Sequence, residues 1–407
     1  MQLPEDFIRY TRAMMGKERF EQYLQAFNGD APVSIRLNPL KTAGMTVAEG
    51  EPVPWCQEGY YLPRRPQFTM DPLLHAGCYY VQEAASMFVS HVLRQYVSRP
   101  VSMLDLCAAP GGKSTAAIAS LPAGSVLFSN EPVRQRASIL LENIAKWGYP
   151  DCTVTNNYPR DYRASKLHFD VILCDVPCSG EGMFRKDQAT IGEWSLQNVE
   201  RCAALQYQIV RDAWTCLNPG GLLIYSTCTF NTKENEENIQ LILNELEDCH
   251  VLPVDTQPTW NITSSLLEGF TEPVYRFVPG ITKSEGLFLC VLCKGEPTLN
   301  GQNKNVKEIP ILSKIGKIRL NLLSPPKSPP TTVVTSLNYQ QAMAYLRGEA
   351  LMLPSDTPRG TVSVTFDGHV LGTVKNIGSR ANNQYPKEWR IKTTHIPTDY
   401  ETILRHT

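Results

Sequence analysis

Residues 101–115 read VSMLDLCAAPGGKST, an apolar run followed by a turn of small residues. Residues 101–106 have the length and composition of a buried strand, and the residues from Lys113 onward favour a helix. Between the two, Gly111 and Gly112 allow the backbone to approach a ligand closely. The stretch therefore predicts the first strand, turn and helix of a parallel α/β sheet.

The same alternation continues outward from this stretch. Further strands are expected at residues 125–130, 153–155, 170–174 and 221–226, and long helices at 133–147 and 196–216. Alternating strands and helices favour a parallel sheet covered on both faces. The apolar run 287–293 is expected to close the sheet. Its Cys290 and Cys293 lack partners at zinc-site spacing, so we interpret them as core residues and expect no metal.

Both flanks of this domain differ from it in pattern. Residues 4–27 have helical spacing and precede short extended pieces, which predicts a small α+β unit over 1–70 followed by the main domain over 71–295. Residues 296–335 are polar and rich in proline, as in a stiff linker. Residues 336–407 suggest a small β-rich module with a short helix at 339–346 and a hairpin turn at Asp367-Gly368.

Composition and charge limit the possible classes of protein. A length of 407 residues predicts two or three domains, and no apolar run is long enough to cross a membrane. Twelve cysteines without disulfide-scaffold spacing indicate a reducing compartment, and with no secretory signal we expect the cytoplasm.

The charges are distributed unevenly along the chain. From residue 301 onward there are 14 Lys and Arg against 7 Asp and Glu, whereas the first 300 residues hold 25 Lys and Arg against 33 Asp and Glu. A basic tail suggests a polyanionic partner.

The glycine turn favours a nucleoside ligand over a simple phosphate site. Gly112-Lys113-Ser114 resembles the end of a P-loop, but that motif requires glycine where this chain has Cys107. Glu131 ends the next expected strand, 20 residues after Gly111, where an acid can accept hydrogen bonds from a ribose. The pair therefore suggests an adenosine-type cofactor.

Two cysteines follow the ends of expected strands. Cys178 belongs to the turn Asp175-Val176-Pro177-Cys178, and Cys228 follows the strand at 221–226. If the two strands are neighbours, both thiols converge on one crevice at the carboxyl edge of the sheet. By local chemistry Cys178 is either a nucleophile or a reduced cysteine in a tight turn, and the spacing alone leaves these alternatives open.

Three segments together carry a family resemblance. Residues 105–113, 175–182 and 226–229 resemble the signature motifs of the Sun-type RNA (cytosine-5) methyltransferases, and residues 34–38, 80–86 and 183–187 extend the match. The likeness is greatest to the bacterial branch called 16S rRNA methyltransferase F. It implies an α/β fold: a Rossmann-like class I methyltransferase domain with a small α+β N-terminal domain and a β-rich, PUA-like C-terminal RNA-binding domain.

The resemblance also implies an activity and a set of site residues. The reaction is methyl transfer from S-adenosyl-L-methionine to cytosine C5 in RNA. Cys228 would be the nucleophile, Cys178 would assist product release, Asp175 would hydrogen-bond the cytosine edge, and Lys113 would meet a substrate phosphate or base. The expected cofactor-binding residues are Cys107, Ala108, Ala109, Pro110, Gly111, Gly112, Lys113, Glu131, Arg136, Asn157, Tyr158 and Asp175.

One departure from the family pattern and several alternatives accompany this reading. The family usually has an acid after the third strand, where this chain has Tyr158; Asn157, Tyr158 or Asp161 could supply the contact with adenine.

The expected partner is RNA. We expect rRNA of the small ribosomal subunit rather than tRNA as the substrate, and we expect a monomer. The alternative functions are those of a non-catalytic RNA-binding assembly factor and of an enzyme that uses Cys178 as its nucleophile.

Overall fold

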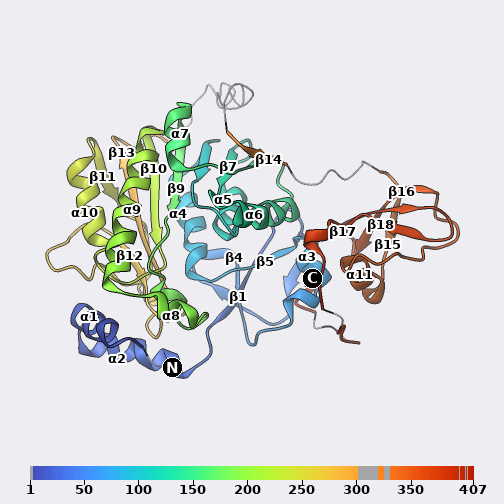
Figure 1. Cartoon of the computed structure of the whole chain (residues 1–407), viewed down its shortest axis with the longest axis horizontal. Helices are drawn as coiled ribbons and strands as arrows, with labels where there is room; N and C mark the ends of the chain where they lie inside the picture. The colour runs from blue at the N-terminus through green and yellow to red at the C-terminus, as the bar shows by residue number, and fades with distance from the viewer. Residues whose placement is uncertain (1–2, 301–319, 325–330, 394, 399, 401) are drawn as a thin grey trace.

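The computed structural model describes residues 3–300, 320–324, 331–393, 395–398, 400 and 402–407. Figure 1 shows a large α/β part on one side, a smaller sheet in the middle and a β-rich module on the other side. In the part of the chain that is described, no helix is long and apolar enough to cross a membrane.

The central sheet has the predicted Rossmann-like arrangement. Its strand order is β11-β13-β10-β9-β6-β7-β8-β14. Five neighbouring strands are parallel: β6 (Ser102–Asp105), β7 (Val126–Asn130), β8 (Cys152–Thr155), β9 (Phe169–Asp175) and β10 (Leu217–Thr227). The strand order reverses between β6 and β9, and the crevice outside such a switch point is where open α/β sheets bind ligands.

Helices cover both faces of this sheet, as the alternating pattern predicted. Helices α4 (Phe88–Tyr96) and α5 (Gly112–Ser120) pack in one apolar cluster, while α9 (Leu196–Thr215) and α10 (Glu236–Glu245) pack in another on the opposite face. Helix α6 (Arg134–Trp147) follows β7 and packs against β8. The strands are largely apolar because they are buried on both sides.

The prediction that residues 287–293 close the sheet is wrong. They form β13 (Leu287–Lys294), which lies inside the sheet between β10 and the edge strand β11 (Cys249–Leu252), and β12 (Tyr275–Phe277) also pairs with it. A continuous apolar run is typical of an interior strand, whereas edge strands are usually short and more polar. Cys290 and Cys293 are fully buried in β13, which confirms their interpretation as core residues.

The N-terminal unit begins with two helices rather than the single helical stretch expected over 4–27. They are α1 (Glu5–Met15) and α2 (Lys17–Gln25), separated at Gly16, whose positive φ of 77° ends α1. Both helices pack on apolar residues of the large part, including Phe184 and Phe230. The following sheet has the order β3-β4-β1-β5 and comprises β3 (Glu51–Val53), β4 (Cys56–Leu62), β1 (Val33–Leu37) and β5 (Tyr79–Val81). It therefore includes residues beyond the boundary expected at residue 70.

The C-terminal module contains the predicted helix and hairpin. Helix α11 (Tyr339–Leu346) packs on the sheet β15 (Val334–Ser336), β16 (Gly360–Phe366), β17 (His369–Asn376) and β18 (Ala381–Asn383). The turn between β16 and β17 has positive φ at Asp367 and Gly368, as the type I′ hairpin turn requires.

This module is docked on the N-terminal unit. One apolar cluster contains Leu37 and Tyr79 of that unit together with Leu346 and Val364 of the module. In addition, β19 (Leu404–His406) pairs with β2 (Met45–Val47). Most of the expected linker over 296–335 lies outside the described residues, but β14 (Leu322–Leu323) pairs with β8 at the edge of the main sheet.

Candidate active site

The predicted glycine turn joins β6 to α5 at the switch point. Gly111 has φ 116°, and a Cβ there would lie 3.2 Å from the Leu140 side chain, so both its backbone conformation and its surroundings favour glycine. Helix α6 holds the turn in place: Arg136 donates to the carbonyl oxygen of Ala109 at 2.9 Å, and Asn143 donates to that of Pro110 at 2.8 Å. The turn is thus a rigid backbone cradle.

Two buried acids lie beside this cradle. Asp105 accepts a hydrogen bond from Ser114 at 2.6 Å through Oδ2, whereas its Oδ1 has no hydrogen-bond partner. Burial raises the pKa of Asp105 to about 7. Glu131, 1% exposed, accepts from the backbone of Val133 at 3.0 Å; its other oxygen makes no hydrogen bond, although Arg136 lies 3.2 Å away. Buried acceptors without donors suit a ligand with hydroxyl or ammonium groups, and S-adenosylmethionine carries both. The residues present therefore fit this cofactor.

Glu131→Gln is expected to weaken cofactor binding by about ten- to one-hundred-fold, because a hydrogen bond to a charged acceptor contributes about 1.5–3 kcal/mol. Isothermal titration with S-adenosylmethionine measures the change. Glu245→Gln on the exposed side of α10 is the control and should leave the dissociation constant unchanged. If wild type and Glu131→Gln bind S-adenosylmethionine with equal affinity, Glu131 is not part of the cofactor site.

The structure brings the two cysteines together. Strands β9 and β10 are parallel neighbours with Asp175 opposite Ser226. The Sγ atoms of Cys178 and Cys228, just beyond the strand ends, lie 3.2 Å apart, and both residues are partly exposed. The hydrogen bond to Cys228, together with burial, raises the pKa of the Cys178 thiol well above its usual range. Cys178 therefore keeps its proton and can donate to the sulfur of Cys228.

A charged pair borders the thiols. Lys113 Nζ lies 2.9 Å from Asp175 Oδ2, and the Ser226 hydroxyl donates to Asp175 Oδ1 at 2.7 Å. Burial lowers the pKa of Lys113, but the carboxylate of Asp175 and the nearby Cys228 raise it by more, so the net direction is upward. Lys113 is therefore a cation that lies beside Asp175 and near Cys228.

A buried polar network below Cys178 was not predicted. Glu234 accepts hydrogen bonds from the backbone of Ser179 at 3.0 Å, from Gln206 at 2.7 Å and from Asn231 at 2.7 Å. Burial raises the pKa of Glu234 to about 7. The network fixes the loop that carries Cys178. The polar run directly after Cys228 could have indicated Glu234 and Asn231, but Gln206 inside a long helix gave no signal.

The residues expected near adenine are only partly brought to the crevice. Asn157 is buried after β8, and its Oδ1 accepts from the backbone of Asn321 at 3.0 Å. Tyr158 is 55% exposed, and Asp161 accepts from the Tyr158 backbone at the start of helix α7 (Pro159–Ser165). Asn321 itself falls in the expected linker and was missed, because nothing in the sequence links it to β8.

Comparisons with known proteins agree with this fold. The family model described as 16S rRNA methyltransferase RsmB/F matches residues 98–293, that of the RsmF N-terminal domain matches 3–84, and that of the RsmF PUA domain matches 332–391. Ribosomal RNA small subunit methyltransferase F of Erwinia tasmaniensis is 26% identical, over 95% of this chain and 96% of its own length. The protein of the same name from Pectobacterium atrosepticum is 34% identical, over 72% and 63%. The crystal structure of NSun6 from Pyrococcus horikoshii with SFG has a TM-score of 0.59 at 18% identity, over 73% of this chain and 99% of that one.

Fold, glycine cradle and family models together define an RNA methyltransferase that depends on S-adenosylmethionine. Within that class, the chain matches the family model of the 16S rRNA methyltransferases RsmB/F and, on either side of it, the models of the N-terminal and PUA domains of RsmF. The Sun-type resemblance, the fold class and the cofactor are thereby confirmed. The roles of individual residues stay predictions.

Proposed function

We propose that this enzyme methylates C5 of a cytosine in 16S rRNA through a covalent adduct with Cys228. The observation that carries the proposal is the 3.2 Å approach of two thiols beside the Lys113–Asp175 pair. The names of the relatives from Erwinia tasmaniensis and Pectobacterium atrosepticum support small-subunit rRNA as the substrate.

The chemistry explains why a thiolate is needed. Cytosine C5 is a weak nucleophile until another nucleophile adds to C6. In the proposed reaction the Cys228 thiolate forms a bond to C6, and C5 becomes electron-rich and takes the methyl group. Loss of the C5 proton to a base then supplies the electron pair that restores the C5–C6 double bond as the C6–S bond breaks. The products are 5-methylcytosine, the demethylated cofactor, a proton and free Cys228.

The other residues of the site have separate roles in this scheme. S-adenosylmethionine supplies an electrophilic methyl group, and the backbone of residues 107–113 and the carboxylate of Glu131 would hold it. Asp175 hydrogen-bonds the cytosine edge and helps its protonation, which makes C6 more electrophilic. Cys178, which retains its proton, hydrogen-bonds Cys228 and assists its release. Because the thiols face a crevice, the target base must be unpaired or flipped out of its stack.

Methyl transfer to purified RNA tests this proposal. The enzyme is incubated with radiolabelled S-adenosylmethionine and 16S rRNA from cells that lack this gene, and the digested RNA is analysed for labelled nucleosides. We expect the label in 5-methylcytidine of 16S rRNA, as free RNA or within the small subunit. A label in another nucleoside would contradict C5 chemistry. Transfer to tRNA alone would favour a tRNA enzyme, and RNA binding without transfer to any RNA would favour an assembly factor.

A further inference from the structure

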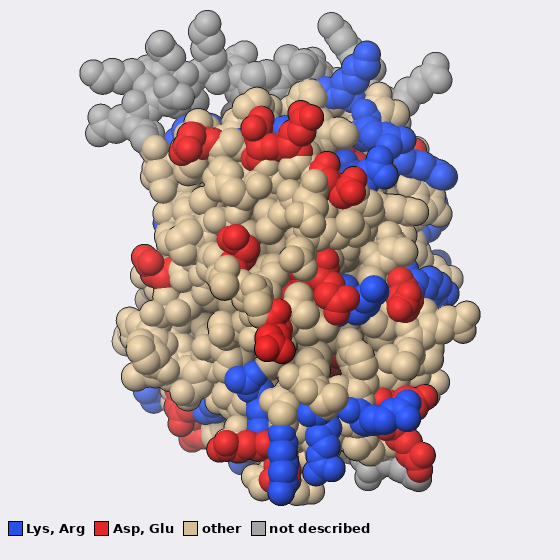
Figure 2. Space-filling model, turned by 90° about the vertical axis from the view of Figure 1, so that its left-hand side faces the viewer, with Lys and Arg blue, Asp and Glu red and all other residues tan. Residues whose placement is uncertain are grey.

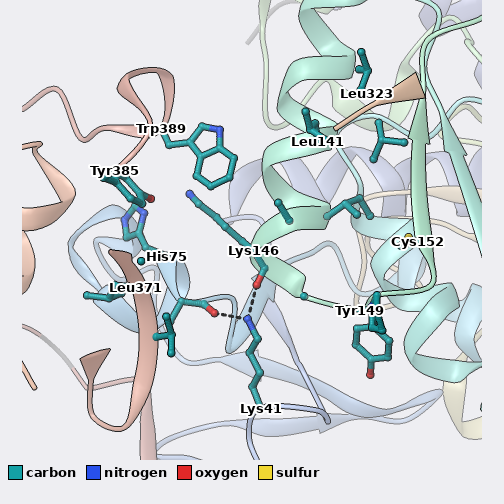
Figure 3. A pocket seen from close by; sticks show the side chains of 18 residues that line it. Lys41, His75, Leu141, Lys146, Tyr149, Cys152, Leu323, Leu371, Tyr385 and Trp389 are labelled. Carbon is teal, nitrogen blue, oxygen red and sulfur yellow. Dashed lines mark hydrogen bonds between the residues drawn. The ribbon is translucent and has the colours of Figure 1, made fainter. Parts of the chain in front are cut away.

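The surface at the end of the molecule opposite the C-terminal module carries charges of both signs. Figure 2 shows Lys and Arg interspersed with Asp and Glu over that face. A hollow of about 550 Å³ lies instead between the C-terminal module, α6 and the N-terminal unit (Figure 3). We name it the interdomain hollow; its lining includes Lys41, His75, Lys146, Leu371, Tyr385 and Trp389. Its volume is within the range of small-molecule sites and accommodates a nucleotide.

An aromatic ring and a cation meet in the interdomain hollow. The ammonium of Lys146 lies 5.6 Å from the ring centre of Trp389, and Figure 3 shows the lysine pointing toward the indole. Trp389 is partly exposed, and its ring lies 6.0 Å from that of Tyr385. Aromatic faces beside cations are how proteins bind unpaired nucleotides, because the base stacks on the ring while its phosphate meets the positive charge.

The floor of the hollow carries a second positive charge. Lys41 Nζ donates to the carbonyl oxygens of Ala76 at 2.7 Å and of Lys146 at 2.5 Å (Figure 3). Lys146 is itself paired with Glu142 at 2.5 Å, whereas no carboxylate among the described residues pairs with Lys41. The charge of Lys41 is therefore not cancelled by an acid, and it favours an anion in the hollow.

Two buried polar atoms in the lining lack partners. His75 Nε2 lies 2.9 Å from the carbonyl oxygen of Thr69, so Nε2 carries the proton and Nδ1 remains an acceptor without a donor. The hydroxyl of Tyr385 also has no hydrogen-bond partner. These side chains are 9% and 4% exposed. Buried polar groups are normally hydrogen-bonded, and the edge of a nucleobase offers both a donor and an acceptor after small side-chain rotations.

A second hollow lies beside the interdomain hollow along α6. It measures about 320 Å³, shares His75 and Lys146 with the interdomain hollow, and extends to Asn143. Asn143 is the residue that donates to the carbonyl oxygen of Pro110 in the glycine turn. The two hollows therefore follow α6 from the C-terminal module toward the active site.

We propose that the interdomain hollow binds one unpaired nucleotide of the substrate RNA, with its base on Trp389 and its phosphate near Lys146 and Lys41. The proposal rests on the function proposed above, since it assumes that the ligand is the RNA to be methylated. It adds a contact for that RNA at a distance from the reacting thiols, in a place where all three parts of the chain meet.

Equilibrium binding of the full-length enzyme to 16S rRNA tests the aromatic part of this proposal. We expect Trp389→Ala to raise the dissociation constant by about ten- to one-hundred-fold, the loss of one stacked base, and Trp389→Phe to stay within about three-fold of wild type. At saturating RNA, Trp389→Ala should keep the wild-type kcat. Equal affinities of wild type and Trp389→Ala would overturn the proposal. If wild type binds RNA but transfers no methyl group, the proposed function is wrong. The dissociation constants of the Trp389 variants relative to wild type then still test whether the interdomain hollow binds a nucleotide.

A charge-matched pair of variants tests the phosphate contact without depending on Trp389. Lys146→Gln and Glu142→Gln both break the same ion pair. If Lys146 contacts a phosphate, Lys146→Gln weakens RNA binding and lowers the slope of log Kd against the logarithm of the salt concentration by about one. Glu142→Gln, in contrast, does not weaken RNA binding. If both variants bind as wild type, or both lose the same affinity, the proposed phosphate contact is wrong.

Discussion

Cys228→Ala is expected to reduce methyl transfer below detection, and Cys178→Ala is expected to trap the enzyme on its RNA. Without Cys228 there is no thiolate to add to cytosine C6, and C5 remains too weak a nucleophile. Without Cys178 the adduct still forms, because Lys113 and Asp175 remain in place. The thiol that lies 3.2 Å from Cys228 is then missing when the C6–S bond must break. Denaturing gels with labelled RNA detect the adduct as a slow protein–RNA band.

Two further variants make this result interpretable. Cys249→Ala changes a partly exposed cysteine on the edge strand β11, away from the crevice, and should behave as wild type. The double variant of Cys178 and Cys228 should form no adduct, because the band requires the nucleophile. The opposite pattern, with an adduct in Cys228→Ala and none in Cys178→Ala, would assign the nucleophile to Cys178.

Asp175→Asn is expected to lower kcat by about 10²- to 10⁴-fold, the usual contribution of a positioned acid or base. The amide keeps the shape of the side chain but cannot relay a proton to the cytosine, and it no longer neutralises Lys113. Single-turnover methylation at saturating RNA and cofactor measures the chemical step directly.

Ser226→Ala is the matched control for this measurement. It removes the hydrogen bond to Asp175 Oδ1 but keeps the carboxylate and its ion pair with Lys113. We expect a loss of about ten-fold or less, the equivalent of one hydrogen bond. If Asp175→Asn is no slower than Ser226→Ala, the carboxylate serves only to position its neighbours.

The sequence was sufficient to predict the part of the fold that local patterns specify. Residues 101–106 are mostly apolar and lead into Gly111-Gly112, so the strand, turn and helix could be expected without any tertiary information. The approach of Cys178 and Cys228 needed one further assumption, that their strands are neighbours. The pairing of β9 with β10 shows that this assumption is correct.

Features that depend on pairing between distant segments could not be predicted. Asn321 reaches Asn157 only because β14 pairs with β8, and two residues of strand carry no recognisable pattern. Gln206 donates a hydrogen bond to Glu234 from α9, and nothing in the sequence of this helix distinguishes Gln206 from its solvent-exposed polar residues. The interdomain hollow likewise exists only because the C-terminal module is docked, which joins Trp389 to Lys146 across 243 positions of sequence.

The pairing of β19 with β2 also has a consequence for the timing of synthesis. Thr407 and Gly44 are hydrogen-bonded across 363 positions, so this contact cannot form until residue 407 has emerged from the ribosome. The apolar side of the N-terminal unit, including Ile35 and Leu37, lacks the partners that cover it until the residues from Leu337 onward, about 300 positions later, have also emerged. At about 5–20 residues per second, the nascent chain carries this uncovered surface for roughly 15–60 s. We therefore expect the nascent N-terminal unit to require chaperone protection during translation, although the finished enzyme buries the same residues.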